Sequence, residues 1–252
     1  MRKNILSIAV ISILSVNAFA KADMSLVRDY MDISGTTQTI ENMSSNITNT
    51  LYQTSAIYGK KPDQKKIQRL QKIFDPQKSI NIVEKEISDE LKNSDLKKMI
   101  AFYRSDAGKE LVDATLDSLS PNAQSELLRF LADLRENPPT KLRVKAINSL
   151  IEALDMQEMI EYMYNEIFSY LNKNAPKERR LSKKKRDELM DMMSNSLQKQ
   201  LFLSSLYVYR DINNDDLNKI TEYLKSKTGT KEKKVIQKAV VKMITSGFKR
   251  AL

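Results

Sequence analysis

The sequence predicts an all-α protein made of two related helical units in tandem, and three observations support this prediction. Five glycines and six prolines are few for 252 residues, and helix-favouring residues such as Leu, Lys, Met and Glu are abundant. Apolar residues recur at spacings of three and four, whereas strict alternation is scarce. Two stretches of the chain also resemble one another, so the same helical plan is expected twice.

The internal similarity predicts a tandem duplication with a bundle-like architecture. Positions around Gly108 match positions 121 residues later, as the pairs Asp95 and Asp216, Leu96 and Leu217, Ser105 and Ser226, and Gly108 and Gly229. An earlier apolar stripe recurs 120 residues later, where Ile40, Met43, Ile47 and Leu51 match Ile160, Met163, Ile167 and Leu171. One net inserted residue accounts for the difference. The expected units are 21–137 and 138–252.

The first twenty residues have the features of a secretory signal peptide. Arg2 and Lys3 precede an apolar run over 5–16, and a small-x-small site ends at Ala20. The run is shorter than the roughly 18 apolar residues that a spanning helix needs. The chain has no cysteine, so it has neither a disulfide nor a cysteine for lipid attachment. We therefore expect cleavage after Ala20 and a periplasmic location, with no transmembrane segment left.

The first unit is expected to consist of helices at 24–33, 36–58, 63–73, 78–92, 95–104, 106–119 and 121–136. Prolines and glycines set the breaks between them, because proline lacks the N–H that a helix interior requires. Pro121 behind Ser120 is a favourable helix start. Two consecutive prolines in the segment 137–140 predict a stiff linker between the units.

The second unit is expected to consist of helices at 141–154, 156–173, 182–210, 216–226 and 230–249. In the longest of these, Leu189, Met193, Leu197 and Leu201 recur every four residues. The stretch from Leu201 to Tyr209 is apolar on most sides, which predicts that this end of the helix is buried in the core.

The segment Phe102, Tyr103, Ser105, Gly108 and Lys109 resembles the recurrent segment of an uncharacterised family of bacterial envelope proteins, labelled as a domain of unknown function. The second unit keeps the serine and the glycine but has Thr230 in place of the lysine. The resemblance implies a helical fold and a location in the envelope. It implies no activity.

Ser105 and Gly108 also have a physical explanation. Ser105 is expected to cap the next helix, and Gly108 then lies in its first turn. Glycine inside a helix costs about 1 kcal/mol relative to alanine, so close contact with a neighbouring helix is the expected reason for it. An anion site at the free N–H groups is the alternative, although Asp106 already places a carboxylate there.

The absence of histidine and cysteine removes most nucleophile–base pairs and most transition-metal sites. We therefore expect no enzyme activity and no cofactor. The alternative is a hydrolase that uses serines or carboxylates, such as Glu86 with Glu90, or Asp155 with Glu158 and Glu161. Each of these carboxylate sets shares a helix face, which is equally typical of a solvated surface.

A calcium loop is a further alternative at Asp211, Asn213, Asp215 and Glu222, which occupy template positions 1, 3, 5 and 12. Asp216 stands where the sharp turn of such a loop needs glycine. A cap role for Asp215 is the simpler expectation.

Charge gives the clearest indication of a binding surface. Residues 21–136 carry 17 Lys and Arg against 18 Asp and Glu, whereas residues 137–252 carry 23 against 14. One stretch of ten residues in the second unit contains seven cations, which form the candidate site: Lys177, Arg179, Arg180, Lys183, Lys184, Lys185 and Arg186. A thinner basic cluster at 60–69 is its counterpart in the first unit.

The basic cluster is expected to contact an anionic partner. With Ser182 as cap, four of its cations occupy a helix start, where the helix dipole disfavours each by roughly 0.3 to 1 kcal/mol. The predicted partner is an envelope protein or an anionic lipid or glycan. Nucleic acid is disfavoured because no aromatic residue interrupts the basic run. The sequence thus predicts an exported, non-catalytic binding protein, with a hydrolase or a carrier of a lipid-like ligand as alternatives.

Overall fold

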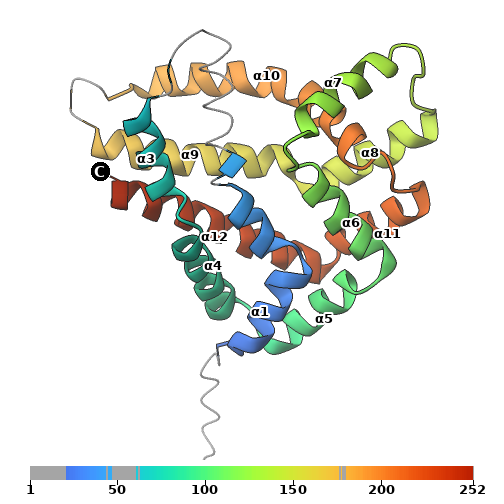
Figure 1. Cartoon of the computed structure of the whole chain (residues 1–252), viewed down its shortest axis with the longest axis horizontal. Helices are drawn as coiled ribbons and strands as arrows, with labels where there is room; N and C mark the ends of the chain where they lie inside the picture. The colour runs from blue at the N-terminus through green and yellow to red at the C-terminus, as the bar shows by residue number, and fades with distance from the viewer. Residues whose placement is uncertain are drawn as a thin grey trace, which may run out of the picture.

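The computed structural model describes residues 21–43, 45–46, 61, 63–175, 177 and 180–251 of the chain (Figure 1). Across these residues the regular structure is helical and no strand is present, which confirms the predicted all-α class. The expected signal peptide and part of the helix expected at 36–58 lie outside the described residues.

The first half of the chain folds into short helices. After a helical stretch over 36–43 that follows α1, the order is α3, α4, α5, α6 and α7. Their bounds are α1 Met24–Ile33, α3 Gln64–Ile73, α4 Pro76–Glu90, α5 Asn93–Tyr103, α6 Asp106–Asp117 and α7 Ala123–Asp133. Aspartates at 23, 63 and 75 cap α1, α3 and α4, because each side chain accepts a hydrogen bond from a free N–H of the first turn.

The second half contains longer helices. Their bounds are α8 Lys141–Leu154, α9 Met156–Asn174, α10 Lys183–Val208, α11 Asn214–Lys225 and α12 Lys227–Ala251. Thr140, at the end of the predicted linker, caps α8 by accepting from the Arg143 N–H at 3.2 Å. The predicted cap at Asp215 is wrong: Asn213 caps α11 and accepts from the N–H groups of both Asp215 and Asp216.

Two helix joints share the same local geometry. The Ser105 hydroxyl accepts from the Gly108 N–H at 3.2 Å, and the Ser226 hydroxyl accepts from the Gly229 N–H at 3.1 Å. A Cβ on Gly108 would lie 2.7 Å from the Tyr103 Cα, and one on Gly229 would lie 2.8 Å from the Leu224 Cα. Each glycine therefore allows a helix start to contact the end of the preceding helix, as the sequence predicted.

Two hydrophobic clusters form the interior. The first core lies between α1, α4, α5 and α12, and its residues include Val27, Met31, Val83, Ile87, Leu96, Met99, Val235, Ala239 and Met243. The second core lies between α6, α8, the end of α10 and α11, and includes Ala107, Leu111, Ile147, Leu150, Leu206, Leu217 and Ile220. Each core thus combines residues from both sides of position 137, because α6 and α12 each pack with helices of the other sequence half.

The two cores meet at an aromatic contact. The rings of Phe102 and Tyr223 stack with their centroids 3.6 Å apart and their planes within 2°. Phe102 lies on α5 and Tyr223 lies on α11, 121 positions later. Each of them lies against the glycine of the joint that follows its helix, Gly108 or Gly229. The contact connects the two cores.

None of the described helices combines the length and the apolar composition needed to cross a bilayer.

Candidate functional site

The predicted basic cluster lies around the turn between α9 and α10, at one end of the molecule (Figure 1). Lys177, Arg180, Lys183, Lys184 and Lys185 are all exposed. Arg179 lies outside the described residues, and of Arg186 the structure describes only the helical backbone. The described members of the cluster are therefore accessible to solvent.

Hydrogen bonds to the end of α9 hold this turn in place. Asn172 donates to the Leu181 carbonyl at 3.2 Å and accepts from the Leu181 N–H at 2.7 Å. The Arg180 guanidinium donates to the carbonyls of Ala175 at 3.0 Å and Lys173 at 3.2 Å, which lie at and just after the last turn of α9. Ser182 then caps α10 by accepting from the Lys185 N–H at 3.3 Å, as predicted.

Two further elements bring cations to the same end of the molecule. The exposed side of α3 carries Lys65, Lys66, Arg69 and Lys72, and α12 ends with Lys249 and Arg250. Arg250 donates to the carbonyl of Ile73, the last residue of α3, at 3.1 Å. Together, the cations of α3, of the α9–α10 turn with the start of α10, and of the end of α12 form the basic end of the molecule.

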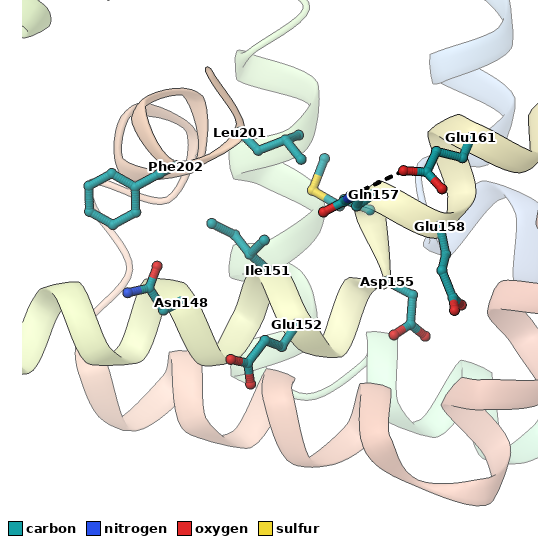
Figure 2. Close-up of a pocket in the computed structure, with 10 residues that line it drawn as sticks. Asn148, Ile151, Glu152, Asp155, Gln157, Glu158, Glu161, Leu201 and Phe202 are labelled. Atoms are coloured by element: carbon teal, nitrogen blue, oxygen red, sulfur yellow. Dashed lines mark hydrogen bonds between the residues drawn. The ribbon is translucent and has the colours of Figure 1, made fainter. Parts of the chain in front are cut away.

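A cleft of about 550 Å³ lies between the α8–α9 joint and α10 (Figure 2). Its apolar lining comes from Ile151, Met156, Leu201 and Phe202, and its carboxylates from Glu152, Asp155, Glu158 and Glu161. This set includes the three carboxylates that the sequence placed on one helix face.

The carboxylates of this cleft do not converge on a common point. Figure 2 shows Glu161 turned toward Gln157, which donates to it at 3.1 Å, while Asp155 and Glu158 point away from the apolar lining. The Asp155 carboxylate pairs with the Lys233 ammonium. No group of acidic residues in the described part of the chain is arranged to hold a metal ion. The cleft therefore lacks the paired acid and base that a carboxylate hydrolase uses.

The calcium-loop alternative also lacks the geometry of a site. Asn213 is occupied as the cap of α11, and Asp216 pairs with Lys219 at 2.7 Å. Glu222 is exposed within α11 rather than at the end of a loop.

A buried polar cluster that the sequence analysis missed lies in the first core. The Glu232 carboxylate is only 5% exposed and accepts hydrogen bonds from three tyrosine hydroxyls. Tyr30 donates at 2.6 Å, Tyr103 at 2.8 Å and Tyr223 at 2.5 Å. Burial raises the pKa of the Glu232 carboxyl, while the three hydrogen bonds act in the opposite direction. The four residues come from α1, α5, α11 and α12, so the cluster joins four helices.

The second core holds leucines 120 or 121 positions from three of these four residues. Leu111 lies 121 positions before Glu232, Leu224 lies 121 after Tyr103, and Leu150 lies 120 after Tyr30, and all three are buried. A glutamate at an apolar stripe position was the signal in the sequence that could have revealed the cluster. It was hidden because lysines at 231, 233 and 234 make this stretch resemble a solvated helix face.

Residues 83–125 match a protein family described as "Uncharacterized protein conserved in bacteria (DUF2059)". The matched region includes the second half of α4, all of α5 and α6, and the joint at Ser105 and Gly108. No curated protein matches the chain, and no solved structure matches it. The similarity supports a relation to an uncharacterised bacterial family over this segment.

Proposed function

We propose that the protein is an exported, non-catalytic helical protein that binds an anionic partner in the bacterial envelope through its basic end. The gathering of cations from three separate chain segments at one end of the molecule is the observation that carries this proposal. Such a concentration of one sign of charge attracts anionic partners over a distance of about 8 Å at physiological salt. The composition of residues 1–20 supports export to the periplasm.

The proposal includes a tandem duplication of the helical unit. Three similarities support it: the serine-capped joints with a close glycine, the buried apolar positions that recur at 120 or 121 residues, and the two left-handed residues. The last of these are Gly35 with φ 71° and Asp155 with φ 50°, which are 120 positions apart. Under this proposal the unit is a shared scaffold, and the basic end, which takes cations from both units, carries the function.

Sedimentation with washed envelope fragments tests the proposal. The wild-type protein is expected to sediment with the fragments at low salt and to be released at high salt, because salt screens exposed charges. The triple variant Lys183→Glu, Lys184→Glu, Lys185→Glu is expected to stay in the supernatant. A matched variant that reverses three exposed lysines on α5 and α6, Lys97→Glu, Lys98→Glu and Lys109→Glu, is expected to sediment like the wild type. Equal sedimentation of the two variants would contradict the proposal.

A further inference from the structure

We propose that the basic end is a peripheral membrane-binding surface and that its target is a bilayer containing anionic phospholipid. This inference rests on the proposed function, since it uses the same cations, and it adds the chemical identity of the partner. Three features support it: the number of elements involved, the scarcity of ion pairs among its described cations, and an aromatic pair among the cations.

The cations form one continuous surface because the helices that carry them, α3, α9 and α12, contact each other. Gly247 of α12 packs against the Ile73 carbonyl at the end of α3, where a Cβ would lie 2.9 Å from the Ile73 side chain. The rings of Tyr170 on α9 and Phe248 on α12 stack with centroids 6.4 Å apart. A single extended acidic peptide would follow one of these elements, whereas a bilayer surface contacts all three at once.

Within the part of the chain that the structure describes, most cations of the basic end form no ion pair with a carboxylate. The ion pair found there joins Lys184 to Glu188 at 3.9 Å, with the Lys184 side chain 87% exposed. Elsewhere several lysines are held closely, as in Lys85 with Asp89 at 2.5 Å and Lys219 with Asp216 at 2.7 Å. Unpaired, exposed cations can contact lipid phosphates without breaking an existing pair, and each is expected to raise the apparent affinity about fivefold.

The aromatic pair distinguishes a bilayer from other polyanions. Tyr170 and Phe248 are both partly exposed, and Lys173 and Lys249 lie close to them in sequence on the same two helices. Tyrosine and other amphipathic rings favour the boundary between headgroups and acyl chains. A glycan or an acidic protein loop has no comparable apolar layer beneath its charges.

Vesicle sedimentation tests this proposal with the full chain. The protein is expected to bind vesicles of phosphatidylcholine with phosphatidylglycerol and not vesicles of phosphatidylcholine alone. Two variants reverse separate parts of the surface: Lys65→Glu, Lys66→Glu, Arg69→Glu on α3, and Lys183→Glu, Lys184→Glu, Lys185→Glu on α10. Each is expected to lower the apparent affinity about a hundredfold, at about fivefold for each lost contact. The Lys97, Lys98, Lys109 variant defined above is expected to bind like the wild type.

A tryptophan reporter tests where the aromatic pair lies. The chain contains no tryptophan, so Tyr170→Trp places a single one at the basic end. On addition of the anionic vesicles its emission is expected to shift to shorter wavelength and to be quenched by brominated lipid, as the ring enters the headgroup region. Binding without either change would overturn the bilayer assignment. Circular dichroism of every variant checks that helicity is retained.

The outcomes separate this inference from the proposed function. No binding to anionic vesicles, together with envelope sedimentation that still depends on the basic end, would overturn the lipid target and leave an anionic glycan or protein as the partner. Loss of binding only with the α10 variant would overturn a surface formed by three elements. Failure in both assays would overturn the two proposals together.

Discussion

Lys185 stands at a helix position where its charge is unfavourable. It is the third residue of α10, and its N–H donates to the Ser182 hydroxyl at 3.3 Å. A glutamate at this position would accept from the Ser182 N–H, complete a capping box and complement the helix dipole. We expect Lys185→Glu to raise the free energy of unfolding by about 0.5 to 1 kcal/mol, measured by urea denaturation.

A matched reversal at Lys199, which is exposed in the middle of the same helix, controls for net charge. Lys199→Glu is expected to leave the free energy of unfolding within about 0.5 kcal/mol of the wild type, because the dipole acts only in the terminal turns. If Lys185→Glu stabilises the fold and also weakens sedimentation with the envelope, the lysine is present for binding at a cost in stability. A destabilising effect would contradict the cap geometry.

The Glu232 cluster gives a second prediction at the scale of single residues. Glu232→Leu would introduce the side chain that the second core has at Leu111, but it would leave three buried hydroxyls without their acceptor. We expect it to lower the free energy of unfolding by about 3 kcal/mol or more, because each unsatisfied buried group costs about 1 to 3 kcal/mol. Urea denaturation monitored by circular dichroism gives the value.

The matched background for Glu232→Leu is the triple variant Tyr30→Phe, Tyr103→Phe, Tyr223→Phe. In that background the leucine is expected to be neutral or stabilising relative to Glu232, because a buried charge without donors is itself unfavourable. The same cost in both backgrounds would show that the hydrogen bonds to Glu232 do not account for its effect.

The tyrosines also predict a dependence on alkaline pH. Burial, followed by the charge of Glu232, raises the pKa of Tyr30 and Tyr103 well above 10, and burial raises the pKa of Tyr209 to about 12. These raised pKa values leave the stability unchanged below pH 10, which is about the pKa of tyrosine in the unfolded chain. Above pH 10 the unfolded chain ionises while the folded protein does not, so stability is lost as the pH rises. Each such tyrosine is expected to lower the free energy of unfolding by about 1.4 kcal/mol per pH unit there. Tyrosinate absorbance should show these residues ionising only as the helices unfold.

Residue types alone predicted some of these contacts and not others. Ser105 and Ser182 were recognisable as caps because a serine preceded a helical pattern. The cap of α11 is Asn213 and not the predicted Asp215, because both residue types are good caps and only the start of α11 decides between them. Glu232 could not be placed without knowing that Tyr30 and Tyr103, more than 100 positions away, face the same point.

At the scale of elements, the joint between α11 and α12 depends on Gly229. Alanine is normally favoured over glycine in a helix by about 1 kcal/mol. Here a Cβ would collide with the Tyr223 carbonyl and lie 2.8 Å from the Leu224 Cα, so the joint would have to open. We expect Gly229→Ala to lower the free energy of unfolding by about 2 kcal/mol or more. Thermal melts should show the loss, while Thr230→Ala, one position later, is expected to be close to neutral. A stabilising Gly229→Ala would contradict the close approach.

Helix bounds were predictable where a break residue marks them, as at 24–33 and 141–154, which the structure reproduces. The start of α7 was predicted at Pro121, but turns continue through 122 and the helix begins at Ala123. Which helix covers which apolar face was not predictable, because periodicity identifies an apolar stripe without identifying its partner. The side chains of Leu189, Met193 and Leu197 lie outside the described residues, so their predicted stripe stays a prediction.

For the whole molecule, the two halves depend on each other because each contributes one helix to the core of the other: α6 of the first half packs in the second core, and α12 of the second half packs in the first core. Residues of α12 such as Ala239 and Met243 complete the first core, and Ala107 and Leu111 of α6 complete the second. The halves 21–137 and 138–252 therefore each contain one helix that covers the other half's core. Separation would expose both cores, with a cost of roughly 25 cal/mol for each Å² of apolar surface.

This dependence predicts the behaviour of the two halves as separate chains. Neither the 21–137 chain nor the 138–252 chain is expected to unfold cooperatively alone, because each lacks a covering helix for its core. Mixed in equal amounts, they are expected to form a one-to-one complex and to recover the helicity of the intact protein, as shown by circular dichroism and sedimentation equilibrium. A mixture with Met243→Asp in the second chain should fail to recover it, since a fully buried side chain of α12 would then bring an unpaired charge into the first core. Cooperative unfolding of either chain alone would mean that α6 and α12 can fold back onto their own halves, so that the exchange is not required by the sequence.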